Sequence, residues 1–394
     1  MSSTPVKRAC LVHVTTVAQT LLFLRGQPAF FRSKGFEVHA ISSPGEVLTR
    51  FGEEQQVTVH AVPIRRTISP LHDLVSLFRL WRLFRLLKPQ IVHAHTPKGG
   101  LLAMIAATLA LVPGRIYHIH GLPLVTSHGL RRILLRWSDR VACRLAHCVF
   151  SVSQSVRQIA ISEGLVIADR IEVLGNGSIN GVDAEGRFRR SPEVLVAAVR
   201  FREKWAIPSH SPVIGFVGRL AREKGIAELA EAWTTLRQDF PDAHLLIVGG
   251  EEEHDPVPPE TLRSLRLDPR AHLIGQDWET PPLYAAMNVL ALPTYREGFV
   301  VTALEAAAME LPVVGTDVAG CRDAIVDGET GTLIPASDAG ALVVALTRYI
   351  NDSELSIRHG TNGRARAALL YRPLIVWESL LSVYHQITPK MNFL

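Results

Sequence analysis

The sequence predicts an α/β protein made of two doubly wound domains, each with a parallel sheet covered by helices. Short apolar runs alternate with longer helical patterns along most of the chain, as in βαβ units that build parallel sheets. The chain has 394 residues, and domains usually hold about 100 to 200. The stretch 175–183 is rich in turn formers and divides the alternation into two series.

The first series predicts five strands and four crossover helices, within an N-terminal domain at 1–185. Each strand is a short apolar run, and each helix is a longer periodic segment. The strands are expected at 10–14, 37–41, 90–94, 115–119 and 148–152, and the helices at 21–34, 71–87, 99–111 and 130–145.

The second series predicts a C-terminal domain at 186–372. A helix at 192–204 precedes strands at 213–218, 244–248, 272–274, 289–292, 312–315 and 332–334. Residues 373–394 form an amphipathic segment, which we expect to be a helix packing back toward the N-terminal domain. Two Rossmann-like domains of this kind are expected to face a cleft.

Composition and charge indicate a globular protein whose N-terminal half has an anionic partner. The chain is 47% hydrophobic and 20% charged, which is ordinary for a globular protein. Residues 1–185 hold 21 Lys+Arg against 11 Asp+Glu, a net charge of +10, whereas residues 186–394 hold 21 against 26, a net charge of −5. The basic half predicts an anionic membrane surface or a polyanionic partner, and no motif supports nucleic acid.

The cysteines and the apolar segments predict a cytoplasmic location. The four cysteines show no C-x-x-C spacing, so neither a zinc knuckle nor a disulfide framework is expected. The longest apolar stretch, 100–113, is shorter than the roughly 20 residues that cross a bilayer.

Two helices of the first domain carry regularly spaced cations beside apolar residues. The cations are Arg79, Arg82, Arg85 and Lys88 on one helix and Arg132, Arg136, Arg140 and Arg144 on the other. This pattern suits an enzyme held at the inner face of an anionic membrane. Arginines that are simply solvated on surface helices explain it nearly as well.

Two segments of the second domain predict a binding site for a sugar nucleotide. After the strand at 213–218, Gly218 permits close backbone approach, and Arg219 and Lys224 can offset the charge of a diphosphate. Solvated loop cations are the alternative interpretation. Gly298 and Phe299 offer backbone amides where a helix is expected to begin, which suits an anion.

Two glutamates flank this second segment. If a helix joined Glu297 to Glu305, they would lie roughly 12 Å apart, comparable with the span from a sugar ring across a diphosphate to a ribose. One carboxylate could then hold each sugar, although Glu305 could also be an ordinary helix surface residue.

These motifs in this order resemble the signature of retaining GT-B glycosyltransferases of family four. The resemblance covers about residues 11–372 and includes further family-like segments at 65–71, 93–100, 118–122 and 175–183. Enzymes similar to it build bacterial capsule, exopolysaccharide or O-antigen repeat units.

The resemblance implies roles for individual residues. Arg219 and Lys224 would bind the donor diphosphate, Glu297 the hydroxyls of the transferred sugar, and Glu305 the ribose. His120 would lie beside the transferred sugar, although a buried structural histidine is the alternative. Backbone contacts are expected from Gly298, Phe299 and Val300, and the acceptor side is expected to include Thr16, Thr96 and Lys98.

The chain departs from the family pattern in two loops. The loop after the first strand, 14–20, has no glycine, where many members have a glycine-rich turn. The run 251–255 is unusually acidic, and we interpret it as a solvated loop rather than a metal site. No metal and no cofactor is expected.

The function expected from these features is transfer of a sugar, with retained configuration, from a nucleotide donor to a polyprenyl-diphosphate-linked glycan. The donor is expected to be linked to uridine diphosphate. Two alternatives stay open: a sugar-nucleotide epimerase of the same architecture, and a catalytically silent glycan-binding protein.

Overall fold

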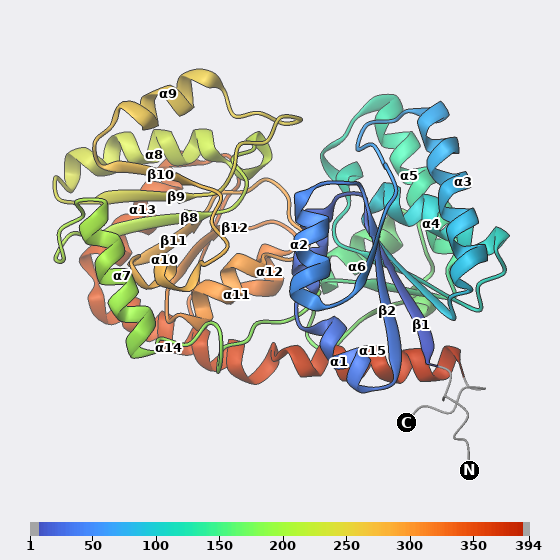
Figure 1. Cartoon of the computed structure of the whole chain (residues 1–394). Helices are drawn as coiled ribbons and strands as arrows, with labels where there is room; N and C mark the ends of the chain where they lie inside the picture. The colour runs from blue at the N-terminus through green and yellow to red at the C-terminus, as the bar shows by residue number, and fades with distance from the viewer. Residues whose placement is uncertain (1–7, 389–394) are drawn as a thin grey trace, which may run out of the picture. The chain divides into compact units, whose positions relative to one another are not determined.

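The computed structural model describes residues 8–388, and the chain forms two compact units (Figure 1). The N-terminal unit comprises residues 1–180 and 374–394, and the C-terminal unit comprises residues 181–373. Both units have a parallel sheet with helices, as the sequence predicts. The expected domain limits were 1–185, 186–372 and 373–394.

The sheet of the N-terminal unit has seven parallel strands in the order β3-β2-β1-β4-β5-β6-β7. They are β1 (Ala9–Val14), β2 (Phe36–Ser42), β3 (Thr58–Ala61), β4 (Ile91–His95), β5 (Gly114–Ile119), β6 (Cys148–Ser151) and β7 (Ile171–Val173). The central strands are buried on both faces, which explains their continuous apolar runs in the sequence.

Helices cover this sheet on both faces (Figure 1). The α-helices are α1 (Gln27–Ser33), α2 (Glu46–Gln55), α3 (Pro70–Leu87), α4 (Pro97–Leu109), α5 (Gly129–Leu145), α6 (Gln154–Ser162) and α15 (Pro373–Ile387), and the short 3₁₀ helices are η1 (Ala18–Leu24), η2 (Pro123–Thr126) and η3 (Ala168–Arg170). Helix α4 packs against α3 and α5, and the three bury Leu80, Leu102 and Ala142 against one face of the sheet.

The last helix, α15, belongs to the N-terminal unit. Its Tyr384 lies 2.7 Å from Nδ1 of His93 on β4, and its Trp377 donates to Oδ1 of Asn180 at 2.6 Å. Residues 389–394 of the expected C-terminal segment lie outside the described residues.

The sheet of the C-terminal unit has six parallel strands in the order β10-β9-β8-β11-β12-β13. They are β8 (Val213–Val217), β9 (His244–Val248), β10 (Ala271–Gly275), β11 (Val289–Leu292), β12 (Val313–Thr316) and β13 (Gly331–Ile334). The helices are α7 (Pro192–Lys204), η4 (Arg222–Lys224), α8 (Ile226–Asp239), α9 (Pro259–Leu267), α10 (Pro281–Ala285), α11 (Val301–Ala308), α12 (Cys321–Ala324), α13 (Ala339–Asn351) and α14 (Ser353–Leu370).

Two local expectations were wrong. The single helix expected at 21–34 is split into η1 and α1 at Gly26, whose φ of +84° interrupts a helix and whose Cα faces the Trp377 ring too closely for a side chain. The helix expected to begin at Gly298 begins at Val301 instead. A helical rise therefore does not describe the path from Glu297 to Glu305.

Within residues 8–388, no helix combines the length and apolar character that a bilayer crossing requires.

In each sheet, the strand order reverses direction at one place: between β1 and β4, and between β8 and β11. Ligands of doubly wound sheets bind beyond the carboxyl ends of the strands at such a switch point. The expected site residues lie on the loops that leave these four strands and β5, or in the helices that follow them: Lys98 is in α4, Lys224 in η4 and Glu305 in α11.

Candidate active site

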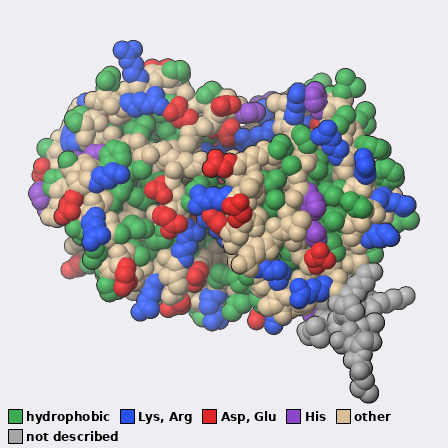
Figure 2. All heavy atoms as spheres, viewed as in Figure 1, with side chains coloured by type: hydrophobic (Ala, Val, Ile, Leu, Met, Phe, Trp, Pro, Cys, Tyr) green, Lys and Arg blue, Asp and Glu red, His purple; other side chains and the backbone are tan. Residues whose placement is uncertain are grey.

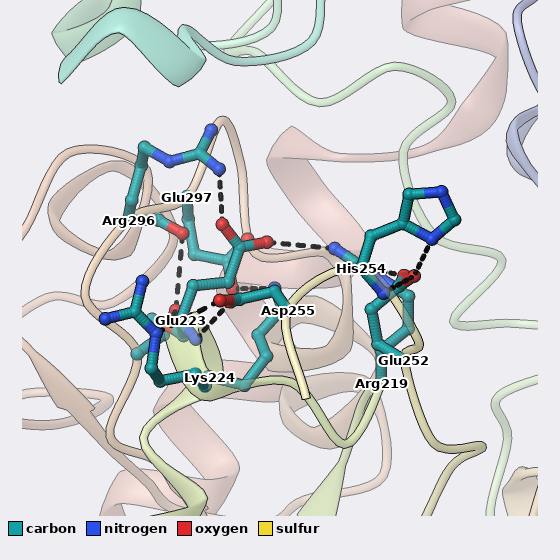
Figure 3. Close-up of polar contacts among 10 residues, drawn as sticks. Arg219, Glu223, Lys224, Glu252, His254, Asp255, Arg296 and Glu297 are labelled. Carbon is teal, nitrogen blue, oxygen red and sulfur yellow. Dashed lines mark hydrogen bonds and ion pairs between the residues drawn. The ribbon is translucent and has the colours of Figure 1, made fainter. Parts of the chain in front are cut away.

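In the C-terminal unit, the loops that leave β8 and β11 are joined by an ion pair between Lys224 and Glu297 (Figure 3). Both side chains are largely buried, with 17% and 16% of their surface exposed. The pair spans the switch point of the sheet. The sequence predicts both residues in a donor site, and the structure brings them into direct contact.

Glycines let these loops approach each other. Gly225 has a φ of +70°, and a Cβ there would lie 1.9 Å from the carbonyl oxygen of Pro293. Gly320 has a φ of +81°, and a Cβ there would lie within 3.0 Å of the backbone of Glu297 and Gly298. These two positions therefore require glycine, and they fix the backbone on both sides of the ion pair.

A second set of ion pairs surrounds Arg219 and Glu223 (Figure 3). Arg219 binds Glu252 and, at 2.9 Å, Glu223, and Arg296 also binds Glu223. Burial works to raise the pKa of Glu223, but Arg296, Lys224 and Arg219 hold it below its usual range. Arg219 and Lys224 after β8 and Arg296 after β11 thus surround the ionised carboxylate of Glu223.

The acidic run at 251–255 is not simply solvated, contrary to our interpretation of the sequence. Glu252 pairs with Arg219, Glu251 with Arg266, and Asp255 accepts from the backbone amide of Glu223 at 2.8 Å. Glu252 and Asp255 balance the charges of Arg219 and Arg222 after β8, so these two carboxylates help to order the loop that leaves β8.

Glu305 lies on α11 and accepts a 2.8 Å hydrogen bond from the hydroxyl of Tyr284. Burial raises the pKa of Glu305 to about 7, against the opposing effects of the Tyr284 hydrogen bond and the nearby Arg187 charge. It is therefore not an ordinary solvated helix residue. Phe299 and Val300 are buried, and the Phe299 ring packs against Tyr371.

In the N-terminal unit, threonines hold the loops that leave β1 and β4. Oγ1 of Thr16 lies 2.8 Å from Oγ1 of Thr96 and accepts from the amide of Gly99. These hydroxyls order a loop that has no glycine. Lys98 pairs with Asp73 at 2.6 Å and donates to the carbonyl of Thr67, so its charge is already balanced within the unit.

His120 follows β5 and is hydrogen-bonded to a second histidine. Its Nε2 lies 2.9 Å from Nδ1 of His95, and Nε2 of His95 lies 3.1 Å from Nδ1 of His13. Burial lowers the pKa of His120 to about 4 and that of His13 to about 4, so both rings are neutral at pH 7. Burial, and the neighbouring imidazoles, also hold the pKa of His95 well below its usual range.

Sequence reasoning missed several of these residues. Glu223, Arg296 and Gly320 were not singled out, and only the folded loops show their contacts. The histidine cluster did leave a signal: His-x-His occurs twice, at 93–95 and 118–120, within strands that are otherwise apolar.

Comparison with known proteins identifies the family of the chain. Residues 29–177 match the family model described as glycosyl transferase 4-like domain, and residues 199–366 match that described as glycosyl transferases group 1. The chain belongs to the GT-B glycosyltransferases of family four. It is a transferase, as the sequence predicts.

Two curated relatives and one solved structure are similar over most of the chain. The capsular polysaccharide biosynthesis glycosyltransferase CapM of Staphylococcus aureus is 34% identical, over 96% of this chain and 98% of CapM. The UDP-Gal:alpha-D-GlcNAc-diphosphoundecaprenol alpha-1,3-galactosyltransferase of Escherichia coli is 27% identical over 82% of each chain. The fold matches that of HepE from Anabaena, solved with UDP and glucose, with a TM-score of 0.78 at 19% identity, over 96% of this chain and all of HepE.

Proposed function

We propose that this glycosyltransferase moves a sugar from a uridine diphosphate donor to a polyprenyl-diphosphate-linked glycan, with retained configuration, in the synthesis of a cell-surface polysaccharide such as capsule or O-antigen. The contact between Lys224 and Glu297 at the switch point carries the proposal. The names of CapM and of the Escherichia coli enzyme, and the UDP complex of HepE, support the donor, acceptor and pathway classes.

The ion pair suggests how the donor is received. In the described structure, Glu297 balances the charge of Lys224. A donor diphosphate would take over that cation together with Arg219, and the carboxylate of Glu297 would then be available to accept hydrogen bonds from the sugar hydroxyls. Diphosphate and sugar would thus be recognised by the two halves of one existing pair.

The reaction uses the same cations. As the bond from the anomeric carbon to the diphosphate breaks, negative charge develops on the leaving phosphate, where Lys224 and Arg219 would stabilise it. A phosphate oxygen would accept the proton of the attacking acceptor hydroxyl. No second carboxylate is required at the anomeric carbon, unlike in retaining glycosidases. His120, neutral at pH 7, would serve as a hydrogen-bonding partner of the sugar through Nδ1, because its Nε2 is bonded to His95.

A direct assay tests this proposal. Sugar nucleotides are screened by the rise in melting temperature that a bound donor causes by mass action. The donor that binds is then incubated with a short-chain polyprenyl-diphosphate-linked sugar, and the anomeric configuration of the product is read by NMR. Inversion of the configuration would remove the retaining mechanism. An epimerised sugar nucleotide formed without acceptor would favour the epimerase, and binding without transfer or hydrolysis would favour a silent binding protein.

A surface on the N-terminal unit supports membrane attachment at the inner face of the membrane, in the cytoplasm. Helices α3 and α5 expose large apolar side chains among arginines, and Figure 2 shows hydrophobic and basic side chains interspersed over this part of the molecule. The exposed apolar residues are Leu71, Leu74, Val75, Phe78 and Leu86 on α3 and Leu130, Ile133, Leu134 and Trp137 on α5. Such a surface suits an interface with anionic lipids.

The structure changes which arginines should be tested. Arg132 binds Glu163 at 2.6 Å and donates to the carbonyl of Leu124, and Arg136 donates to the carbonyl of Glu163, so these two also hold α5 in place. Exposed Arg79, Arg82 and Arg85 on α3 are better probes. Reversing these three charges to glutamate should reduce binding to anionic liposomes while the melting temperature stays near that of the wild type. Unchanged partitioning would exclude this surface as the membrane contact.

A further inference from the structure

Five histidines gather at the carboxyl ends of three neighbouring strands in the N-terminal unit. They are His13 on β1, His93 and His95 on β4, and His118 and His120 on and after β5. His13 stands beside His93 in the sheet register, and His95 stands beside His118. Because side chains alternate between the faces of a sheet, these four paired residues share one face.

His118 is the least satisfied member of the cluster. Its side chain is buried, with 1% exposed, and within the described residues neither ring nitrogen has a hydrogen-bond partner. A neutral imidazole carries one donor and one acceptor, and an unpaired buried polar group costs about 1–3 kcal/mol. The position therefore points to a ligand that binds imidazole nitrogen.

The surrounding nitrogens converge at this place. One ring nitrogen from each of His95, His118 and His120 lies within 4.8 Å of the other two. Nδ1 of His95 and Nε2 of His120 are already 2.9 Å apart. Zinc–nitrogen bonds of about 2.0–2.1 Å in tetrahedral geometry place ligand nitrogens about 3.4 Å apart, so small ring movements would complete the set.

We propose that His95, His118 and His120 form a three-histidine site for a transition metal ion of the Zn²⁺ class, with a fourth position open. The remaining nitrogen of His95, Nε2, lies 3.1 Å from Nδ1 of His13. With the metal on Nδ1 of His95, its Nε2–H would donate to His13, which is the outer-shell bond that orients a ligating histidine. Imidazole is a preferred ligand of zinc, copper, iron and nickel ions.

A second group, His13, His93 and His95, is the competing arrangement in this cluster. It shares His95, so the two sites would not be filled independently. Nδ1 of His93 is already bound to the hydroxyl of Tyr384, and all three rings are fully buried. His120 is only partly buried, which gives the proposed site a route for an ion to enter.

Metal binding to the full-length chain tests the proposal. The purified protein is treated with a chelator, titrated with Co²⁺ and Zn²⁺, and assayed by visible absorption, elemental analysis and melting temperature. One ion per chain is expected, with the absorption of tetrahedral Co²⁺ and a higher melting temperature on Zn²⁺ binding. Absence of tight binding by the wild type would overturn the proposal.

Variants separate the two arrangements. His118→Gln should weaken binding by more than about 100-fold, and His13→Ala by about 10- to 100-fold through loss of the outer-shell bond. His93→Gln should bind as the wild type does. The matched control is His272→Gln, because His272 and His244 form a buried 2.9 Å pair in the C-terminal unit and, among the described residues, belong to no three-residue group.

The outcomes are decisive in both directions. Loss of binding in His93→Gln but not in His118→Gln would assign the ion to the other group, and unchanged binding in both would exclude the cluster. If His118→Gln does not fold, X-ray absorption of the Zn²⁺-loaded wild type decides instead: three imidazoles and one light ligand are expected. A different number of imidazoles would reject the site. None of these measurements depends on glycosyl transfer, so failure of the proposed function leaves them interpretable.

Discussion

The two units arrange their switch-point residues in opposite ways. In the C-terminal unit the loops beyond β8 and β11 carry cations and carboxylates joined in ion pairs, with Arg219 46% exposed. In the N-terminal unit the strand ends carry buried and, for His120, half-buried histidines that are neutral at pH 7. Ion pairs can exchange one anionic partner for another, whereas buried neutral rings can only hydrogen-bond or bind a metal. The contrast favours the C-terminal unit as the site of the proposed donor diphosphate.

The largest expected effect comes from removing the cation of the ion pair. Lys224→Ala should lower the rate of transfer by about 10²- to 10³-fold, because it removes one charged donor from the leaving phosphate. The fold should stay intact, because Lys224 is not part of the apolar core of the unit, but the melting temperature should fall somewhat because Glu297 loses its ion-pair partner. Initial rates at saturating donor, with circular dichroism as a check of folding, measure this.

Arg222→Ala is the matched control for that variant. Arg222 occupies the same 3₁₀ turn, is 71% exposed, and pairs with Asp255. Its loss should leave the rate within about twofold, because an exposed pair contributes little. If both variants behave alike, the turn acts through general charge, and the specific role of Lys224 is lost.

In the C-terminal unit, Glu297 should bind the sugar of the donor and Glu305 its nucleotide. Glu297→Gln should weaken the sugar nucleotide by roughly 10- to 100-fold, the size of a charged hydrogen bond, yet leave UDP binding unchanged or tighter because Lys224 is freed. Glu305→Gln should weaken UDP and the sugar nucleotide equally. Calorimetry with both ligands measures this, and an equal loss for both ligands in Glu297→Gln would contradict its assignment to the sugar.

The fold followed from the sequence most closely where strands are buried on both faces. The runs 244–248 and 289–292 were predicted with their observed limits, because parallel strands covered on both faces are continuously apolar. Strands β3 and β7 and helices α2 and α6 were missed: β3 is only half-buried, β7 has three residues, and the helices are short and carry few buried residues.

The sequence predicts individual residues of the candidate site but not the contacts between them. Lys224 and Glu297 stood out individually through their motifs, yet they are far apart in the sequence, and only the neighbouring positions of β8 and β11 bring them together. Gly320 lies still further along the chain, and its role depends on a close backbone approach that no local pattern encodes.

Each unit also buries a carboxyl against a tyrosine hydroxyl, which allows a direct comparison. Tyr117 donates to Asp139 at 2.8 Å in the N-terminal unit, as Tyr284 does to Glu305 in the C-terminal unit. Burial raises the pKa of Asp139 to about 7. Because this folded-state pKa lies above the unfolded value, the folded state binds more protons between about pH 4 and 7, and Asp139 lowers stability as the pH rises through that range.

Asp139→Asn should remove this part of the pH dependence. Between pH 5 and pH 8 the wild type should lose on the order of 2 kcal/mol of unfolding free energy through ionisation of Asp139. The variant should not show this loss, because the amide does not ionise. Denaturant unfolding at the two pH values measures it. The corresponding variant in the C-terminal unit is Glu305→Gln, which also replaces the carboxyl by an amide of the same length. Parallel curves for wild type and Asp139→Asn would show that Asp139 does not titrate in this range.

The smallest expected effect is on the pH dependence of donor affinity, which should involve Glu305 but not Asp139. If ribose hydroxyls donate to Glu305, the bound form must be ionised, so donor affinity should fall by up to about tenfold for each pH unit below about 7. The sugar nucleotide is the ligand to use, because its esterified diphosphate does not titrate there. Glu305→Gln should remove this dependence. Tyr284→Phe should move its midpoint to higher pH, since the Tyr284 hydrogen bond favours the ionised carboxylate. Donor affinity that is independent of pH in the wild type would place Glu305 with Asp139, as a structural carboxyl that the nucleotide does not touch.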